Sequence, residues 1–253
     1  MGRIVLNGQN LTIDQVAMVA REGWLVEIDS AAVERINRSR EIVEEFVRRE
    51  EVVYGVTTGF GRFSDVAISK DETETLQRNL IVSHACGVGE IFGKDVVRAI
   101  MLLRINTLCR GYSGVKLETL NLLVEMLNKG VHPVIPQKGS LGASGDLAPL
   151  AHMVLVMLGE GRAEYGGEVM EGAEALKMAG LKSCTLSSKE GLALINGTQA
   201  MSAVASLTLY DAMMLVRMAD VAASLTLEAL NGIIDAFDER IHSVRGHRGQ
   251  IVS

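Results

Sequence analysis

The sequence predicts a mainly α-helical globular protein. Of its 253 residues, 48% are hydrophobic, 22% are charged and only 3 are prolines, which is typical of a soluble, helix-rich chain. Helix-start patterns recur along it, because Thr12, Ser69 and Ser187 are each followed three positions later by Glu or Gln. A chain of this length can bury a core as one large domain or two small ones. We expect an N-terminal region over residues 1–110 and a central helical region over residues 111–253.

The charge pattern and the cysteines exclude several classes of protein. The formal net charge is −6 and the basic residues are scattered, which argues against a nucleic-acid surface and favours small solutes as partners. The 3 cysteines, Cys86, Cys109 and Cys184, form no Cys-x-x-Cys pair, so we expect neither a disulfide framework nor a metal site. Residues 1–6 lack the apolar run of a signal peptide. These features together predict a cytoplasmic protein.

One uncharged stretch, residues 191–210, is long enough to cross a bilayer. Asn196, Gln199 and several hydroxyl residues make it too polar for lipid. We therefore expect a buried helix there and no membrane partner.

Helices are expected where apolar residues recur at helical spacing between capping and stop signals. These spans are residues 12–20, 30–49, 69 to about 87, 93–110, 116–129, 147–158 and 200 to about 237. Two prolines make residues 132–136 extended, and the Gly pair at 166–167 predicts a hairpin, the only clear β signal. Residues 52–63, with three glycines and two threonines, are expected to form a loop.

The turn at residues 139–149, Gly-Ser-Leu-Gly-Ala-Ser-Gly-Asp-Leu-Ala-Pro, is the best candidate for chemistry. Its small residues let the backbone fold back, so that the amide nitrogen of Gly145 can reach the carbonyl carbon of Ala143. Ring closure and loss of water, including the Ser144 hydroxyl, would leave an exocyclic alkylidene electrophile. Two simpler interpretations compete with this one: an ordinary helix start and a hydrolase elbow, whose second glycine would fall at Asp146.

Three strings, in order, carry a resemblance. Residues 139–151 resemble the signature of the aromatic amino acid ammonia-lyases, which cyclise Ala-Ser-Gly into a 4-methylidene-imidazole-5-one group. Residues 54–61, Tyr-Gly-Val-Thr-Thr-Gly-Phe-Gly, and 190–199, Glu-Gly-Leu-Ala-Leu-Ile-Asn-Gly-Thr-Gln, resemble two further signatures of that family. The resemblance implies the helical-bundle ammonia-lyase fold, with small N-terminal loops and minor β structure, and no external cofactor.

The resemblance also assigns roles. It makes Tyr54 a base or acid on a loop over the prosthetic group, whereas composition alone favours a half-buried aromatic. Asn196 contacts the prosthetic group and the substrate, and Leu192 lines the side-chain pocket. Gly142 and Asp146 assist formation of the ring, although the helix dipole alone would also favour an acid at position 146.

Residues 76–85 indicate the substrate. Leu-Gln-Arg-Asn-Leu followed by Ser83 and His84 resembles the histidine-specific branch, whereas phenylalanine-specific relatives carry an aromatic-aliphatic pair there. An imidazole at His84 can exchange hydrogen bonds with a substrate imidazole, which an apolar pair would leave unpaired. The implied reaction is loss of ammonia from L-histidine to give trans-urocanate, with tyrosine or phenylalanine as alternative substrates.

The resemblance runs from Ile4 to about Gln250 and then stops. Residues 242–250 resemble a segment from the middle of longer family members, with Gly246 in place of a proline. We therefore expect a chain truncated before the C-terminal half, which would supply a further tyrosine, an arginine, an aromatic and an acid. Two hypotheses follow: half of an enzyme that forms a homotetramer or other homo-oligomer, or a non-catalytic or split-enzyme fragment that needs a complementary C-terminal chain.

Overall fold

The computed structural model describes residues 2–58, 70–141 and 145–252; for residues 70 and 71 it describes the backbone only. The chain divides into two compact units, Met1–Leu207 (unit 1) and Thr208–Ser253 (unit 2). Both are mainly helical, which confirms the predicted fold class. The division predicted at residue 110 stays a prediction.

Unit 1 contains eight helices in its described residues, and a ninth begins in it. They are α1 (Ile13–Arg21), α2 (Ser30–Arg48), α3 (Lys70–His84), α4 (Lys94–Leu108), α5 (Leu117–Lys129), α6 (Leu147–Met157), α7 (Gly172–Met178), α8 (Glu190–Ile195) and the start of α9 (Gln199–Ala229).

Local sequence signals explain several helix ends. Thr12 and Gln15 form the predicted capping box at α1, each side chain accepting the other's backbone N–H. Asp29 caps α2 by accepting from Ala31. Gly130 ends α5 in the left-handed region at φ 76°, where a glycine carries no steric penalty.

Only half of the predicted capping box at Ser187 forms: the Ser187 N–H donates to the Glu190 carboxylate at 2.9 Å, but Ser187 does not cap the helix. Helix α8 begins at Glu190 after Lys189, whose φ is 71°. The Ser187 hydroxyl donates to the Glu190 carboxylate at 2.8 Å. The two residues therefore form a turn ahead of the helix. The Glu190 carboxylate is fully buried and needs donors, so the Ser187 hydroxyl donates to it instead of accepting from a backbone N–H of the helix.

Short strands connect the helices. The predicted hairpin is confirmed as β6 (Arg162–Tyr165) paired antiparallel with β7 (Glu168–Glu171), and β4 (His132–Pro133) pairs with β6. Two further pairs were not predicted: parallel β1 (Arg3–Leu6) with β2 (Leu25–Ile28), and antiparallel β3 (Val88–Ile91) with β5 (Pro136–Lys138). Strands of two to four residues are too short to show a period-2 pattern.

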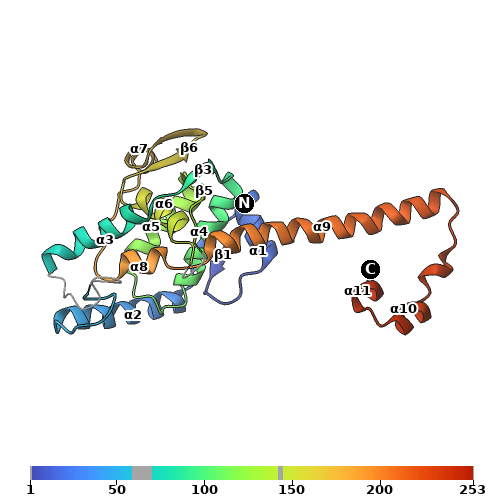
Figure 1. The fold of residues 1–253 in the computed structure, drawn as a ribbon, viewed down its shortest axis with the longest axis horizontal. Coiled ribbons are helices and arrows are strands. Elements are labelled where there is room, and N and C mark those ends of the chain that lie inside the picture. Colours follow the sequence, from blue (N-terminus) through green and yellow to red (C-terminus); the bar gives the residue numbers. More distant parts are fainter. Residues whose placement is uncertain (1, 59–69, 142–144, 253) are drawn as a thin grey trace. The chain divides into compact units, whose positions relative to one another are not determined.

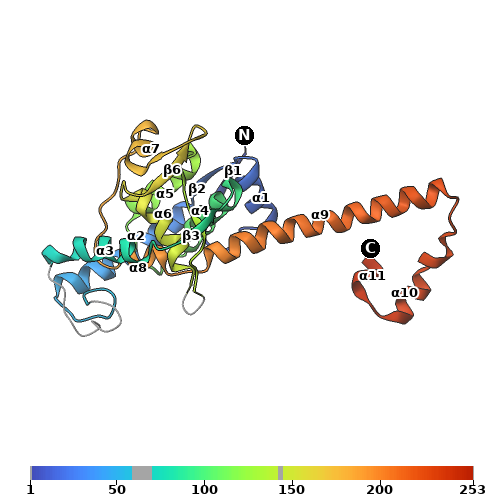
Figure 2. The ribbon, with the colours of Figure 1, turned by 45° about the horizontal axis from the view of Figure 1, so that its top comes forward.

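The core of unit 1 surrounds α4, α5 and α6, which lie in the middle of that unit in both ribbon views (Figures 1 and 2). Helix α4 packs against α1 and α5, and α6 packs against α3 and α8. Fully buried side chains of α4 and α5 include Ile100, Met101, Leu102, Ile105, Leu120, Leu123 and Leu127. Because α4 is apolar around most of its circumference, it must be covered on several sides.

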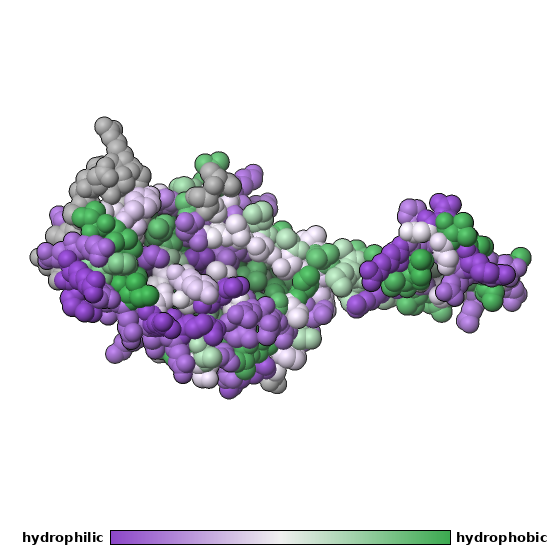
Figure 3. Space-filling model, turned by 90° about the horizontal axis from the view of Figure 1, so that it is seen from below, coloured by the Kyte–Doolittle hydropathy of each residue, from purple (hydrophilic) through white to green (hydrophobic). Residues whose placement is uncertain are grey.

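Unit 2 holds the rest of α9, followed by η2 (Ile234–Phe237), α10 (Glu239–Arg245) and α11 (Arg248–Val252). The helix predicted to continue to residue 237 ends at Ala229, because Asn231 has a φ of 50° and leaves the helical path. None of the described residues 208–252 is buried. Apolar side chains such as Leu215 and Leu225 are 70% and 63% exposed. Figure 3 shows this apolar surface in green.

The apolar stretch from Glu190 to Ala229 has the length and hydropathy of a membrane-crossing helix, and part of it is buried inside the protein. The core helix of a soluble protein satisfies the same criterion. Residues 196–198 interrupt the stretch between α8 and α9.

Candidate functional site

The turn that leads into α6 is described at both of its ends. Gly142, Ala143 and Ser144 lie outside the described residues. Gly145 has a φ of 126°, a conformation that side-chain-bearing residues rarely adopt. A Cβ added there would lie 2.6 Å from the carbonyl oxygen of Gly197 and 2.8 Å from its nitrogen. Only glycine therefore fits at position 145.

Asp146 fastens the end of this turn to the start of α9. It is 4% exposed, and its backbone N–H donates to the Gly197 carbonyl at 2.6 Å. One carboxylate oxygen accepts from the Ser140 hydroxyl at 2.5 Å, and the other accepts from the backbone N–H of Met201 at 2.8 Å. Asp146 stands at the N-cap of α6, next to the first turn where it was expected, and its side chain makes no cap bond to that helix; its part in ring formation stays a prediction.

The loop between α8 and α9 carries the predicted asparagine. Asn196 is the C-cap of α8, with its N–H donating to Leu192 at 3.0 Å, and its side chain is exposed. Leu192 is half-buried in α8. Gly197 follows directly and contacts Gly145. The structure thus brings the 139–149 turn and the 190–199 string together.

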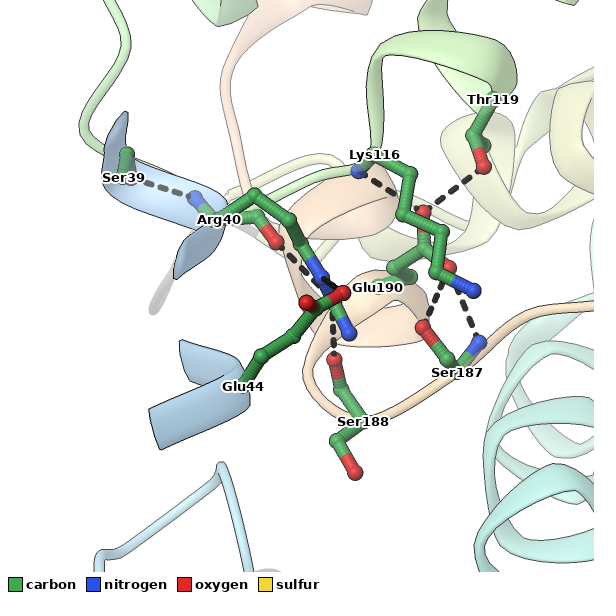
Figure 4. Close-up of polar contacts among 9 residues, drawn as sticks. Ser39, Arg40, Glu44, Lys116, Thr119, Ser187, Ser188 and Glu190 are labelled. Atoms are coloured by element: carbon green, nitrogen blue, oxygen red, sulfur yellow. Dashed lines mark hydrogen bonds and ion pairs between the residues drawn. The ribbon is translucent and has the colours of Figure 1, made fainter. Parts of the chain in front are cut away.

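A buried glutamate anchors the start of α8. Glu190 is fully buried, and its carboxylate accepts four hydrogen bonds. They come from the Lys116 backbone at 3.0 Å, the Thr119 hydroxyl at 2.7 Å, and the backbone and hydroxyl of Ser187 at 2.9 and 2.8 Å. Figure 4 shows these donors converging on Glu190 from the start of α5 and from the turn before α8. The carboxylate therefore holds α8 to α5.

Arg40 holds the same turn from the other side. Its guanidinium donates to the carbonyls of Ser188 and Gly114 at 3.0 and 3.1 Å, and its Nε contacts Glu44 at 3.0 Å (Figure 4). Lys189 adds a hydrogen bond to the Ser113 carbonyl at 2.9 Å. Helix α2 and residues 113–114 therefore fix where α8, with Leu192 and Asn196, begins.

Helix α3 supplies the predicted specificity residues at its C-terminal end. The Ser83 hydroxyl donates to the Leu80 carbonyl at 3.0 Å, and His84 Nδ1 lies 2.8 Å from the same oxygen. Because a carbonyl only accepts, Nδ1 carries the proton and Nε2 of the neutral ring is an acceptor. Gln77 of the same helix is 2% exposed and accepts from the Gly191 N–H at 2.8 Å, which ties α3 to α8.

The segment after α3 also meets the lead-in to the turn. Gly139 has a φ of 145°, and a Cβ there would lie 3.0 Å from Gly87 Cα. The Gly87 N–H donates to His152 Nε2 of α6 at 3.0 Å, and burial lowers the pKa of His152. The backbone close to His84 is therefore packed against residues close to the turn, whereas the His84 ring itself contacts Leu80 and Ser83 of its own helix.

Tyr54 lies near α2, at a cavity that the described residues of the turn do not line. It is 62% exposed and lies within a turn in which the Thr57 hydroxyl accepts from the Val53 N–H at 2.9 Å. It lines a cavity of about 660 Å³ between α2 and the 110–114 segment. Described residues of the 139–149 turn, α3 and the Asn196 loop do not line this cavity. Its role over the prosthetic group stays a prediction.

Three site-supporting residues were missed by sequence reasoning: Gly197, Glu190 and Arg104. Arg104 is 2% exposed on α4 and donates to Gln199 at 2.8 Å and to the Ala193 carbonyl. The sequence did carry a signal for Arg104, which stands within a nearly all-apolar helix. A buried arginine needs hydrogen-bond partners, so its position indicates that it binds groups of another segment. Within the described ranges, no three His, Cys, Asp or Glu side chains are grouped to hold a metal ion.

Comparison with known proteins places this chain in a family. Residues 11–253 match the aromatic amino acid lyase family, and the chain belongs to it. Over all of its 253 residues it is 62% identical to histidine ammonia-lyase of Caldanaerobacter subterraneus subsp. tengcongensis, and covers 50% of that protein. The chain spans about half the length of the curated relatives it matches.

Solved structures agree with this placement. Histidine ammonia-lyase from Trypanosoma cruzi superposes with a TM-score of 0.93 at 39% identity, over 99% of this chain and 50% of that one. The phenylalanine aminomutase of Pantoea agglomerans superposes with a TM-score of 0.91 at 38% identity, over 100% of this chain and 48% of that one. Proteins named for different substrates and reactions therefore share this fold, and side chains of the site must decide between them.

Proposed function

We propose that this chain is the N-terminal part of a histidine ammonia-lyase, which eliminates ammonia from L-histidine to give trans-urocanate. The observation that carries the proposal is the packing of Gly145, the last residue of the Ala-Ser-Gly string, against Gly197, which follows Asn196 directly. The 62% identity to a histidine ammonia-lyase supports the choice of substrate. Tyrosine and phenylalanine are the alternative substrates.

The prosthetic group in this proposal is 4-methylidene-imidazole-5-one, made from Ala143, Ser144 and Gly145. Formation joins the Gly145 nitrogen to the Ala143 carbonyl carbon and releases two waters, one carrying that carbonyl oxygen and one the Ser144 hydroxyl. The described neighbours suit such a group, since position 145 has no room for a Cβ and has a φ of 126°. Once formed, the group would supply an electrophile that accepts the amino group of the substrate.

The chain's own residues would hold the turn and the substrate. Asp146 immobilises the end of the turn through its bonds to Gly197, Ser140 and Met201. The N-terminus of α9 points its Met201 N–H at this carboxylate, and its positive end would favour negative charge developing nearby. The exposed amide of Asn196 would orient the substrate, and Leu192 would line the pocket for its side chain.

His84 would choose the substrate. With Nδ1 donating to Leu80, its Nε2 can accept from the N–H of a substrate imidazole. A phenyl ring would leave that acceptor unpaired, which costs binding energy. Ser83 would support the ring from the adjacent position, where its hydroxyl lies 3.1 Å from His84 Nδ1.

Tyr54 would remove the β-proton of the substrate. A phenol, with a normal pKa of about 10, is a good base near neutral pH only if its surroundings lower that pKa. We therefore propose that further parts of the assembly cover Tyr54, whose side chain is 62% exposed in this chain. A homotetramer or other homo-oligomer would provide such cover, and the exposed apolar side chains of unit 2 would lie between its subunits.

A combined mass and activity measurement tests the proposal. Intact mass of the purified chain should be lower than the encoded mass by two waters, and the protein should form urocanate from histidine faster than it deaminates tyrosine or phenylalanine. Full mass together with urocanate formation would contradict the proposed chemistry.

The second candidate is a split enzyme or non-catalytic fragment, and the half-length match favours considering it. It predicts activity only after the C-terminal half of a relative is added. A cytoplasmic location, without nucleic-acid or membrane partners, completes the proposal; the three free cysteines are consistent with that location.

A further inference from the structure

Arg104 ties together the two helices on either side of the Asn196 loop. It lies on α4 and is 2% exposed. Its guanidinium donates to the side-chain oxygen of Gln199 at 2.8 Å and to the main-chain carbonyl of Ala193. Ala193 belongs to α8 and Gln199 opens α9. One side chain therefore sets the spacing across residues 196–198.

Gly197 lies between that guanidinium and the turn. A Cβ on Gly197 would overlap the Arg104 guanidinium and the Gln199 amide oxygen. The Gly197 backbone also meets Gly145, and its carbonyl accepts from the Asp146 N–H at 2.6 Å. Gly197 is thus in close contact with both the guanidinium and Gly145, so a shift of the guanidinium should be felt at Gly145.

A purely stabilising role explains Arg104 poorly. Burying a guanidinium is costly, and well-packed apolar residues often replace buried ion pairs without loss. Its Nε has no hydrogen-bond partner in the part of the chain that the structure describes. Burial lowers the pKa of Arg104 to about 10, so the group still carries its charge at neutral pH. Arg98, six residues earlier on α4, is also buried, but it donates to the carbonyls of Val19 and Leu127 and to His132, none of which lies within residues 139–149 or 190–199.

We propose that Arg104 is a positioning residue, which holds the Gly197 backbone against Gly145 and thereby positions Gly145 and Asn196 for ring formation and catalysis. The consequence for ring formation rests on the proposed function, whereas the contact with Gly197 does not. Arg104 touches neither substrate nor reacting atoms in this account. Its effect passes through Gln199, Ala193 and Gly197.

The test compares Arg104→Met with Arg104→Lys and with Arg98→Met, a matched loss of a buried cation from the same helix. Each variant is co-expressed with the C-terminal half of the Caldanaerobacter relative. Hydrogen exchange reports the Asp146 amide, which donates to Gly197, and intact mass reports the fraction of chain that has lost two waters. The thermal midpoint measures general destabilisation.

For Arg104→Met we expect the Asp146 amide to exchange at least about tenfold faster than in the wild type. The reason is that the charge-assisted hydrogen bonds from Arg104 to Gln199 and Ala193, on either side of Gly197, are lost, and Gly197 is the acceptor for this amide. The dehydrated fraction should fall, and Arg104→Lys should restore part of it, since an ammonium can donate to one of the two oxygens. Arg98→Met should lower the thermal midpoint and leave both readouts at their wild-type values. If Arg104→Met is insoluble, the test rests on Arg104→Lys and Arg98→Met. Arg104→Lys should then show faster exchange at Asp146 and a smaller dehydrated fraction than Arg98→Met.

Unchanged exchange at Asp146 in the Arg104 variants would overturn the proposal, as would equal losses in Arg98→Met. A wild-type chain that never loses two waters would refute the proposed function instead. In that case the exchange comparison still decides whether Arg104 holds Gly197.

Discussion

Replacing Glu190 by glutamine tests whether buried hydrogen bonds, rather than apolar packing, hold the start of α8. Each carboxylate oxygen accepts two bonds, Oε1 from Lys116 and Thr119 and Oε2 from Ser187. Glutamine keeps one oxygen and presents an NH2 group in place of the other. A hydroxyl can rotate and accept from that group, but a backbone N–H cannot.

The expected loss follows from this count. One buried backbone N–H is left without an acceptor, which costs about 1–3 kcal/mol, and the remaining bonds lose the assistance of the charge. We expect Glu190→Gln to lower the free energy of unfolding by about 2–4 kcal/mol. Because α8 carries Leu192 and ends at Asn196, we also expect a lower kcat when the variant is co-expressed with the C-terminal half of a relative.

Urea unfolding followed by circular dichroism measures the change. Glu44→Gln is the matched control, because that side chain is 50% exposed and pairs with Arg40 at 3.0 Å. Because the Glu44 carboxylate is half solvated, although Arg40 is buried, and glutamine can still accept from Arg40 Nε, this change should cost less than about 1 kcal/mol. If Glu190→Gln costs no more than Glu44→Gln, hydrogen bonding to Glu190 does not determine the position of α8.

Three further predictions concern the turn, the substrate and pH. Gly145→Ala should retain its full encoded mass, because a Cβ would lie 2.6 Å from the Gly197 oxygen, whereas Gly166→Ala, with nothing within 4 Å, should still lose two waters; dehydration of both variants would refute this packing argument. His84→Phe should lower kcat/KM for histidine and raise it for phenylalanine, and a wild-type enzyme faster with phenylalanine would argue against the role of His84. Burial, opposed by the hydrogen bond that His132 donates to Glu164, lowers the pKa of His132 to about 4, so the unfolded chain binds the extra proton first and stability should fall as the pH drops from about 6.5 to 4. His132→Gln should flatten that slope in urea titrations, and an unaltered slope would assign the effect to other groups.

Features encoded within a few neighbouring residues could be predicted from sequence. The capping box at Thr12 and Gln15, the left-handed end of α5 at Gly130 and the β6–β7 hairpin all satisfy their backbone groups locally. Three family signatures also pointed to the family that the comparison shows. The β1–β2 and β3–β5 pairs escaped because each strand's partner is remote in sequence.

The sequence by itself determined which residues are candidates for the chemistry: a small-residue turn, an asparagine loop and a histidine at a helix end. Only the tertiary structure decided what surrounds them. It placed Gly197 against Gly145, Arg104 beneath Gly197, and Tyr54 beside a separate cavity. Residue chemistry is a local property, whereas the partners of a buried donor, or of a glycine without room for a Cβ, come from segments brought together only when the core packs.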